Sequence, residues 1–217
     1  MDEDHIRSNN YFLQAQHFLS KYKNGNLITG AETYKIYSTN PPKTATALPQ
    51  GQFMDHYSTA LNIENSAQVQ FYHKSKLVPG AESLPFEHAL SFLKPVFAHL
   101  GGATGAYTGQ DAPTNLYAAS GIGAAPVICY ESIWGEWVAR SVRSGAQFIA
   151  IITNDGWWEN TSGKDQHWIM PSCVLLKPGA GFVARPIPVS RHLLTSAGIL
   201  CSKVNGGLKP RLNKILT

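Results

Sequence analysis

The sequence predicts an α/β protein in which part of the sheet is parallel. Residues 148–152 (FIAII) form a continuous apolar run, which is typical of a parallel strand buried on both faces. A second apolar segment at 126–128 precedes a helical pattern at 132–143, for which Ser132 is the expected N-cap. We read both apolar segments as buried strands of an open parallel sheet.

Three further segments carry clear helix or strand patterns. They are a helix at 10–22 and two strands at 57–63 and 69–72, with a turn at 64–66 between the strands. Asn9 or Asn10 is the expected cap of the helix, because asparagine side chains accept hydrogen bonds from the first free backbone N–H groups. The Pro- and Thr-rich segment 39–52 is predicted to be a loop.

Chemically distinctive side chains follow three of the predicted strands. They are Lys74, Cys129 and Asp155, and in open parallel sheets the carboxyl ends of strands are where sites form. Cys129 stands at a strand-to-helix turn, where backbone N–H groups favour a thiolate. A lone cysteine in a strand is more often a small core residue, and a lone lysine is usually solvated. The three together favour a reactive site.

Three sequence motifs carry a family resemblance. They are YHKSKLVPGAESLPF at 72–86, APVICYES at 125–132, and IAIITNDGWW at 149–158 followed by SGKDQH at 162–167. In this order they resemble the nitrilase superfamily and, within it, the apolipoprotein N-acyltransferase family. ITGAETYKIY at 28–37 also resembles the strand that precedes the lysine strand. The resemblance implies a nitrilase-type α-β-β-α sandwich, incomplete in this chain.

The resemblance also implies a Glu-Lys-Cys triad and a covalent reaction. Cys129 matches the nucleophile, which takes an acyl chain from a phospholipid ester as a thioester and passes it to the N-terminal amine of a diacylated lipoprotein. Lys74 matches the lysine that stabilises the oxyanion, and Glu82 matches a second carboxylate beside the triad. The general-base glutamate is expected upstream of Met1, and Glu3 is expected to be a solvated residue. No cofactor and no metal are implied.

Two segments are candidates for the lipid-binding side of the site. Trp157, Trp158 and Asn154 follow a strand end and are the expected substrate-binding residues, although the tryptophans could instead cover the sheet edge. The amphipathic pattern at 84–100 predicts a helix interrupted at Pro95, and both core packing and a lipid-facing lid stay open for it.

The family's membrane segments are expected to lie outside this chain. No apolar run approaches the ~20 residues that a membrane-spanning helix needs, and no signal peptide is visible. The resemblance implies a bacterial inner membrane protein whose catalytic domain faces the periplasm. The chain is therefore expected to be truncated at its N-terminus.

Charge changes abruptly after His167. Residues 1–167 hold 11 Lys and Arg against 14 Asp and Glu, whereas residues 168–217 hold 7 Lys and Arg and no acid. Restoring one base after the His167 codon lets residues 183–191 read as RSANTGIS and residues 192–199 as FINQRGD, which resemble the family's continuation. We expect a partial catalytic domain at 1–167 and a frame-shifted, non-native tail at 168–217. Cys173, Cys201 and His192 then carry no metal or redox role.

Loss of the general-base strand and of the native C-terminal strands is expected to expose apolar sheet edges and to give an inactive, poorly stable product. Two other functions remain open. One is a soluble nitrilase-like amidase that acts on a small C–N substrate with the same triad. The other is a non-catalytic protein whose basic tail docks on an anionic surface. Nucleic acid is not an expected partner, because no recognised nucleic-acid motif accompanies the basic excess.

Overall fold

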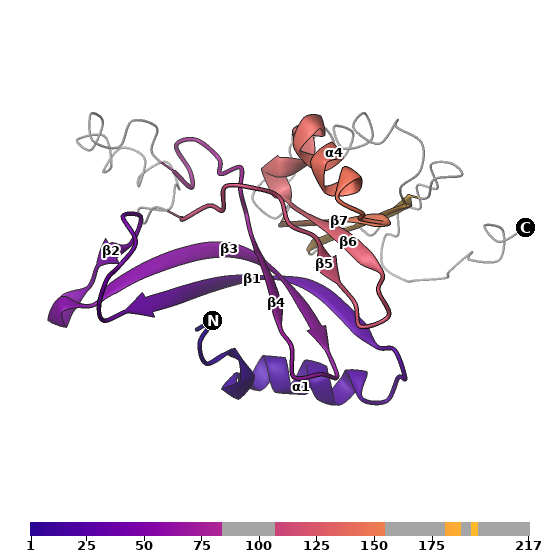
Figure 1. The fold of residues 1–217 in the computed structure, drawn as a ribbon, viewed down its shortest axis with the longest axis horizontal. Coiled ribbons are helices and arrows are strands. Elements are labelled where there is room, and N and C mark those ends of the chain that lie inside the picture. Colours follow the sequence, from indigo (N-terminus) through magenta and orange to yellow (C-terminus); the bar gives the residue numbers. More distant parts are fainter. Residues whose placement is uncertain (84–106, 155–180, 188–191, 195–217) are drawn as a thin grey trace, which may run out of the picture.

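Two sheets face each other between two outer helices in the computed structural model, which describes residues 1–83, 107–154, 181–187 and 192–194. Figure 1 shows α1 on the outer side of one sheet and α4 on the outer side of the other. This is the expected α-β-β-α order. The predicted helix at 84–100 and the residues Asp155, Trp157 and Trp158 lie outside the described residues.

The first sheet is built on a long antiparallel pair. Its strands are β1 (Asn26–Tyr37), β2 (Thr46–Ala47), β3 (Phe53–Glu64) and β4 (Gln70–His73). β3 lies in the centre, with β1 along its whole length on one side and both β2 and β4 on the other. The three strands predicted here are confirmed. The predicted loop at 39–52 holds only β2 and a short 3-10 helix, η2 (Pro49–Gly51).

Helix α1 (Asn10–Leu19) covers the outer face of this sheet. The Asn9 side chain accepts hydrogen bonds from the backbone N–H groups of Tyr11 and Phe12, which confirms Asn9 as the cap. A short 3-10 helix, η1 (Ile6–Ser8), leads into it. The buried face of the helix packs on β3 in a cluster of Ile6, Phe12, Leu19, Leu61 and Ile63.

The second sheet contains the predicted parallel strands. Its order is β5 (Leu116–Tyr117), β6 (Gly123–Ile128), β7 (Phe148–Asn154), β8 (Gly181–Ile187) and β9 (His192–Leu194). β6, β7 and β8 are parallel to one another. Helix α4 (Gly135–Arg143) covers the outer face, where Val138 packs against Val127 and Ile149. The apolar run at 126–128 is therefore buried, as predicted, and the run at 148–152 is buried at its centre and partly buried at Phe148 and Ile152.

The start of the helix after Cys129 differs from the prediction. A 3-10 helix, η4 (Cys129–Ile133), comes first, and α4 begins only at Gly135 with Trp134 in the N-cap position and no side-chain cap. Ser132 is not the cap, because its hydroxyl is buried inside η4 with no hydrogen-bond partner. The tighter 3-10 turn absorbs the change in chain direction at Cys129.

The far edge of β7 also differs from expectation. We expected the C-terminal strands to be missing, which would leave β7 with an open edge. Instead, the backbone of β8 pairs with β7 over seven residues, and β9 pairs with β8 in antiparallel fashion. The described backbone of the basic tail therefore covers that edge.

The two sheets pack closely enough to exclude a side chain at one position. The inter-sheet cluster contains Ala60, Tyr72, Leu116 and Ile128. A Cβ atom placed on Gly30 of β1 would lie 2.5 Å from Cγ2 of Ile152 on β7. This is shorter than carbon atoms tolerate, so glycine sets the separation of the sheets here.

Gly30→Ala should therefore destabilise the fold by about 1–3 kcal/mol through overpacking. Urea unfolding measures this loss. Ile152→Ala removes the opposing Cγ2 atom, so adding Gly30→Ala in that background should cost clearly less. An equal cost in both backgrounds would show that the contact between the sheets is not the cause.

Candidate active site

Cys129 occupies the predicted strand-to-helix turn. It directly follows β6, begins η4, and is partly buried where it packs against the inter-sheet cluster. Its φ of 49° lies in the left-handed region, which few residues other than glycine adopt. Such strain persists only where the surroundings enforce it, and it concentrates at functional sites.

Lys74 follows β4 directly and is almost completely buried, with 1% of its side chain exposed. Its ammonium donates to both carboxylate oxygens of Glu82 at 2.8 and 2.7 Å. The backbone N–H of Val78 also donates to Glu82 at 2.8 Å. A buried ammonium needs such partners, because taking a charged group out of water is costly unless it is paired and hydrogen-bonded. The structure thus brings together the predicted pair Lys74 and Glu82.

Glu131 joins the loop after β4 (residues 74–82, the lysine loop) to the turn at Cys129. The sequence reasoning missed this residue. Its fully buried carboxylate accepts hydrogen bonds from the N–H groups of Ser75 (2.6 Å) and Lys76 (3.1 Å) and from the hydroxyl of Tyr72 (2.7 Å). Its second oxygen accepts from the N–H of Ile128 at 2.8 Å. One carboxylate therefore fixes the backbone next to both Lys74 and Cys129. The available signal was an acid two positions after the cysteine, at the end of an apolar strand.

The electrostatics of Glu131 reflect two opposing effects. Burial raises the pKa of its carboxyl, and the hydrogen bonds from Ile128, Tyr72, Ser75 and Lys76 oppose that rise. Burial, together with the nearby Glu131 carboxylate, also raises the pKa of the Tyr72 hydroxyl, which keeps that hydroxyl a donor.

The expectation that Glu3 is solvated is wrong. Only 9% of its side chain is exposed. It accepts a 2.6 Å hydrogen bond from the hydroxyl of Thr33 and lies 2.7 Å from Nε2 of His73. Burial raises the pKa of Glu3, but these partners outweigh it and the net pKa is lowered. The reason lies in tertiary contacts with β1 and β4, which sequence spacing does not reveal.

Asn154 lies at the same end of the second sheet as Cys129, where the carboxyl ends of β6 and β7 lie. β6 and β7 are parallel and Ile128 is opposite Ile152, so both chains leave the sheet at one end. The backbone of Asn154 pairs with Ile187 of β8.

The described residues contain no cluster of three or more potential metal ligands.

A sequence profile of carbon-nitrogen hydrolases matches residues 32–173. The chain belongs to the carbon-nitrogen hydrolase family. The family resemblance expected from the lysine and cysteine motifs is confirmed. In this carbon-nitrogen hydrolase, the matched segment includes Lys74, Glu82, Cys129 and Glu131.

Curated relatives of this carbon-nitrogen hydrolase carry a more specific name. An apolipoprotein N-acyltransferase of Chlorobaculum tepidum is 28% identical over 145 residues, which are 65% of this chain and 27% of that protein. Another, of Vibrio parahaemolyticus, is 35% identical over 98 residues, which are 44% of this chain and 18% of that protein. The chain thus spans a minor part of the length of these relatives.

Within the described ranges, no helix has the length and hydropathy of a membrane span.

A solved structure agrees with the fold. A single-residue mutant of the amidase from Nesterenkonia sp. AN1 superimposes with a TM-score of 0.50 at 12% identity, covering 92% of this chain and 68% of the amidase. At this identity the match shows a common carbon-nitrogen hydrolase fold and nothing about substrate.

Replacing Glu131 should damage the fold strongly. Glu131→Ala leaves four donors without their partner, and we expect a loss of about 3 kcal/mol or more in the free energy of unfolding. Glu131→Gln should cost less, because one oxygen still accepts. Glu136→Gln is the matched control, since its ion pair with Arg143 is exposed and should change stability by less than about 0.5 kcal/mol. Equal effects of Glu131→Ala and Glu136→Gln in urea unfolding would contradict this role.

Glu3 should make stability depend on acid pH. Its pKa is lowered in the folded state, so its stabilising contribution is present above its ordinary value of 4.5 and is lost as the pH falls through the folded value. The difference in free energy of unfolding between the wild type and Glu3→Gln should therefore shrink as the pH decreases below 4.5. A difference that stays constant with pH would exclude the pairing with His73 as its source.

Proposed function

We propose that the domain is an N-acyltransferase of lipoprotein maturation, which moves an acyl chain from a phospholipid to a diacylated lipoprotein through a thioester on Cys129. The main support is the pairing of a buried Lys74 with Glu82 in a loop that Glu131 ties to the Cys129 turn. The names of the curated relatives support the same reaction.

The proposed first half-reaction forms the thioester. The Cys129 thiolate attacks the ester carbonyl, and Lys74 stabilises the negative oxygen that develops. The ester C–O bond then breaks, and the lysophospholipid leaves as an alcohol after taking up a proton. In the second half-reaction the lipoprotein amine attacks the thioester and gives up a proton to the base, the C–S bond breaks, the amide forms, and Cys129 returns as a thiolate. By resemblance, a glutamate from an earlier strand of the family acts as the base.

The second candidate is a nitrilase-like amidase that acts on a small C–N substrate, and the match to the general carbon-nitrogen hydrolase profile supports it. Both reactions would use the same nucleophile and lysine. They differ in the donor, which is a long-chain ester in one and a short amide in the other.

Acylation of Cys129 is the direct test. Intact-mass and peptide mass spectrometry after mixing with phospholipid vesicles should show one acyl group on Cys129 that hydroxylamine removes. We expect this in the product of the frame-restored gene and not in the chain as printed. Cys129→Ala should abolish the adduct altogether, and an adduct that persists would disprove the nucleophile. Acylation from short amides and none from phospholipid would favour the amidase.

Lys74→Ala should slow thioester formation by a factor of about 100 to 1,000, the usual effect of losing an oxyanion donor. Rapid-quench measurement of the acyl-enzyme gives this rate. Lys21→Ala is a suitable comparison, because Lys21 is an exposed lysine that follows α1 and is not assigned to the oxyanion or to lipid binding. Near-normal rates for Lys74→Ala would remove its proposed role.

We also propose that residues 168–217 are read in a shifted frame. The change from mixed charge to 7 cations and no acids at this point supports it. Sequencing the coding DNA across the His167 codon tests it directly. A single missing base that restores the family's reading is expected, and an unbroken frame as printed would disprove the proposal.

A further inference from the structure

Two tryptophans and two cations gather beside the lysine loop. Lys76 Nζ lies 4.1 Å from the ring centre of Trp137 and 5.5 Å from that of Trp134, and Arg140 Cζ lies 5.0 Å from the ring centre of Trp137. Trp137 is buried beneath the cations, whereas Trp134 is 44% exposed and the neighbouring Ile133 is 37% exposed. We call Lys76, Ile133, Trp134, Trp137 and Arg140 the cationic tryptophan patch.

The local charges leave the patch basic. Glu136 is the acid of α4, and its carboxylate lies 2.6 Å from Arg143 Nη2 on the same helix. That acid is therefore already neutralised by a neighbour. The Lys76 ammonium and the Arg140 guanidinium lie over the Trp137 ring, which attracts a cation without neutralising its charge.

We propose that the cationic tryptophan patch docks on the surface of a bilayer that contains anionic lipid. Trp134 and Ile133 enter the headgroup region, where amphipathic tryptophan rings are favoured, and Lys76 and Arg140 face the lipid phosphates. The mixture of exposed apolar and cationic groups fits a bilayer better than a nucleic acid, which would need a longer row of cations.

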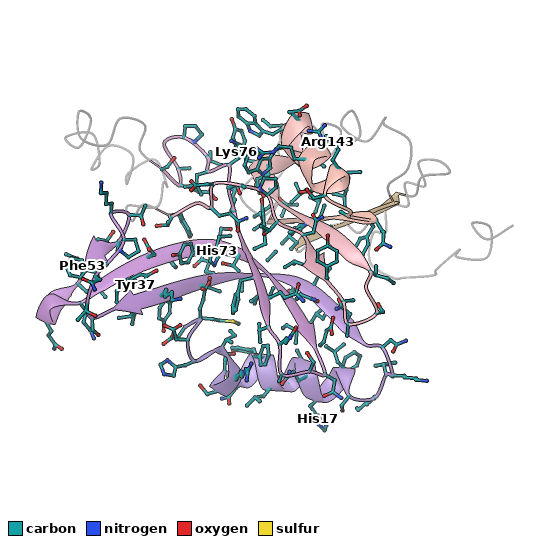
Figure 2. The ribbon with its side chains drawn as sticks, viewed as in Figure 1. His17, Tyr37, Phe53, His73, Lys76 and Arg143 are labelled. Carbon is teal, nitrogen blue, oxygen red and sulfur yellow. The ribbon has the colours of Figure 1, made fainter. Side chains whose placement is uncertain are left out.

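The position of the patch links it to the candidate active site. Lys76 follows Lys74 by two positions, Trp134 follows Cys129 by five, and Glu131 ties the two segments together. Figure 2 shows Lys76 and Arg143 around α4, with His17 of α1 at the opposite end of the molecule. Docking therefore deepens the proposed function and rests on it, since a phospholipid donor must reach Cys129 from a bilayer.

Vesicle co-sedimentation of the full chain tests the proposal. The probes are vesicles of phosphatidylcholine alone and of phosphatidylcholine mixed equally with phosphatidylglycerol. Lys76→Gln combined with Arg140→Gln should weaken binding to the anionic vesicles about 25-fold, because each cation near such a surface contributes about 1 kcal/mol, or fivefold. Trp134→Ala should weaken binding to both kinds of vesicle.

The matched controls lie on the opposite layer. Lys21→Gln combined with Lys23→Gln removes the same charge, and Tyr22→Ala removes an exposed aromatic ring (54% exposed) next to α1. Both should leave binding within about twofold, because they lie outside the patch. If the Lys76/Arg140 variant binds no worse than the Lys21/Lys23 variant, net charge or the basic tail carries the binding and the proposal is overturned. Polyuridylate serves as a nucleic-acid probe. If the Lys76/Arg140 variant loses binding to polyuridylate but keeps its binding to vesicles, the proposal is overturned as well.

A second measurement does not depend on affinity. Brominated phosphatidylcholine in the vesicles should quench tryptophan fluorescence, and Trp134→Phe should remove a distinct part of that quenching. If bromine quenches the fluorescence of Trp134→Phe as strongly as that of the wild type, Trp134 lies outside the bilayer and the proposal is overturned. Vesicle binding requires no thioester, so its failure can be distinguished from failure of the acylation test at Cys129.

Discussion

The buried carboxylate of Glu131 is the interaction on which the rest of the site depends. It binds backbone N–H groups on both sides of the sandwich, from the loop after β4 and from the end of β6. Unpaired, those donors would each cost free energy inside the protein, and so would the carboxylate. The two sheets therefore cannot separate at this point without breaking a whole set of hydrogen bonds. Lys74 and Cys129 are held in relation to each other as a result.

The site thus has two carboxylates with different tasks. Glu82 compensates the charge of Lys74 through its side chain, and Glu131 accepts mainly from the backbone. Glu82 forms the ion pair with the buried Lys74, and Glu131 fixes the position of the loop. The strained φ of Cys129 fits this division, because the hydrogen bond at Ile128 holds the chain just before the turn.

Sequence alone predicted the strands and the first helix well, because their signals are local. Apolar runs marked β6 and β7, and Asn9 marked the start of α1. Motif and order also placed Lys74 and Glu82 together, and the structure shows their pairing, whereas the catalytic roles of Lys74, Glu82 and Cys129 stay predictions. The sequence did not predict the roles of Glu131, Glu3 and Ser132, since each depends on partners or burial set by the tertiary fold. Spacing along the chain carries no information about such contacts.

The contact between the lysine loop and Glu131 has a consequence for synthesis of the chain. The loop at 75–76 leaves the ribosome long before Glu131, with which it pairs across 55 to 56 positions. Until residue 131 emerges, water must hydrate the loop's N–H groups, and the ammonium of Lys74 has only Glu82 to compensate it. Ordering of this loop is therefore a late event, and a growing chain that stalls between the two segments lacks the hydrogen bonds that join the loop to the Cys129 turn.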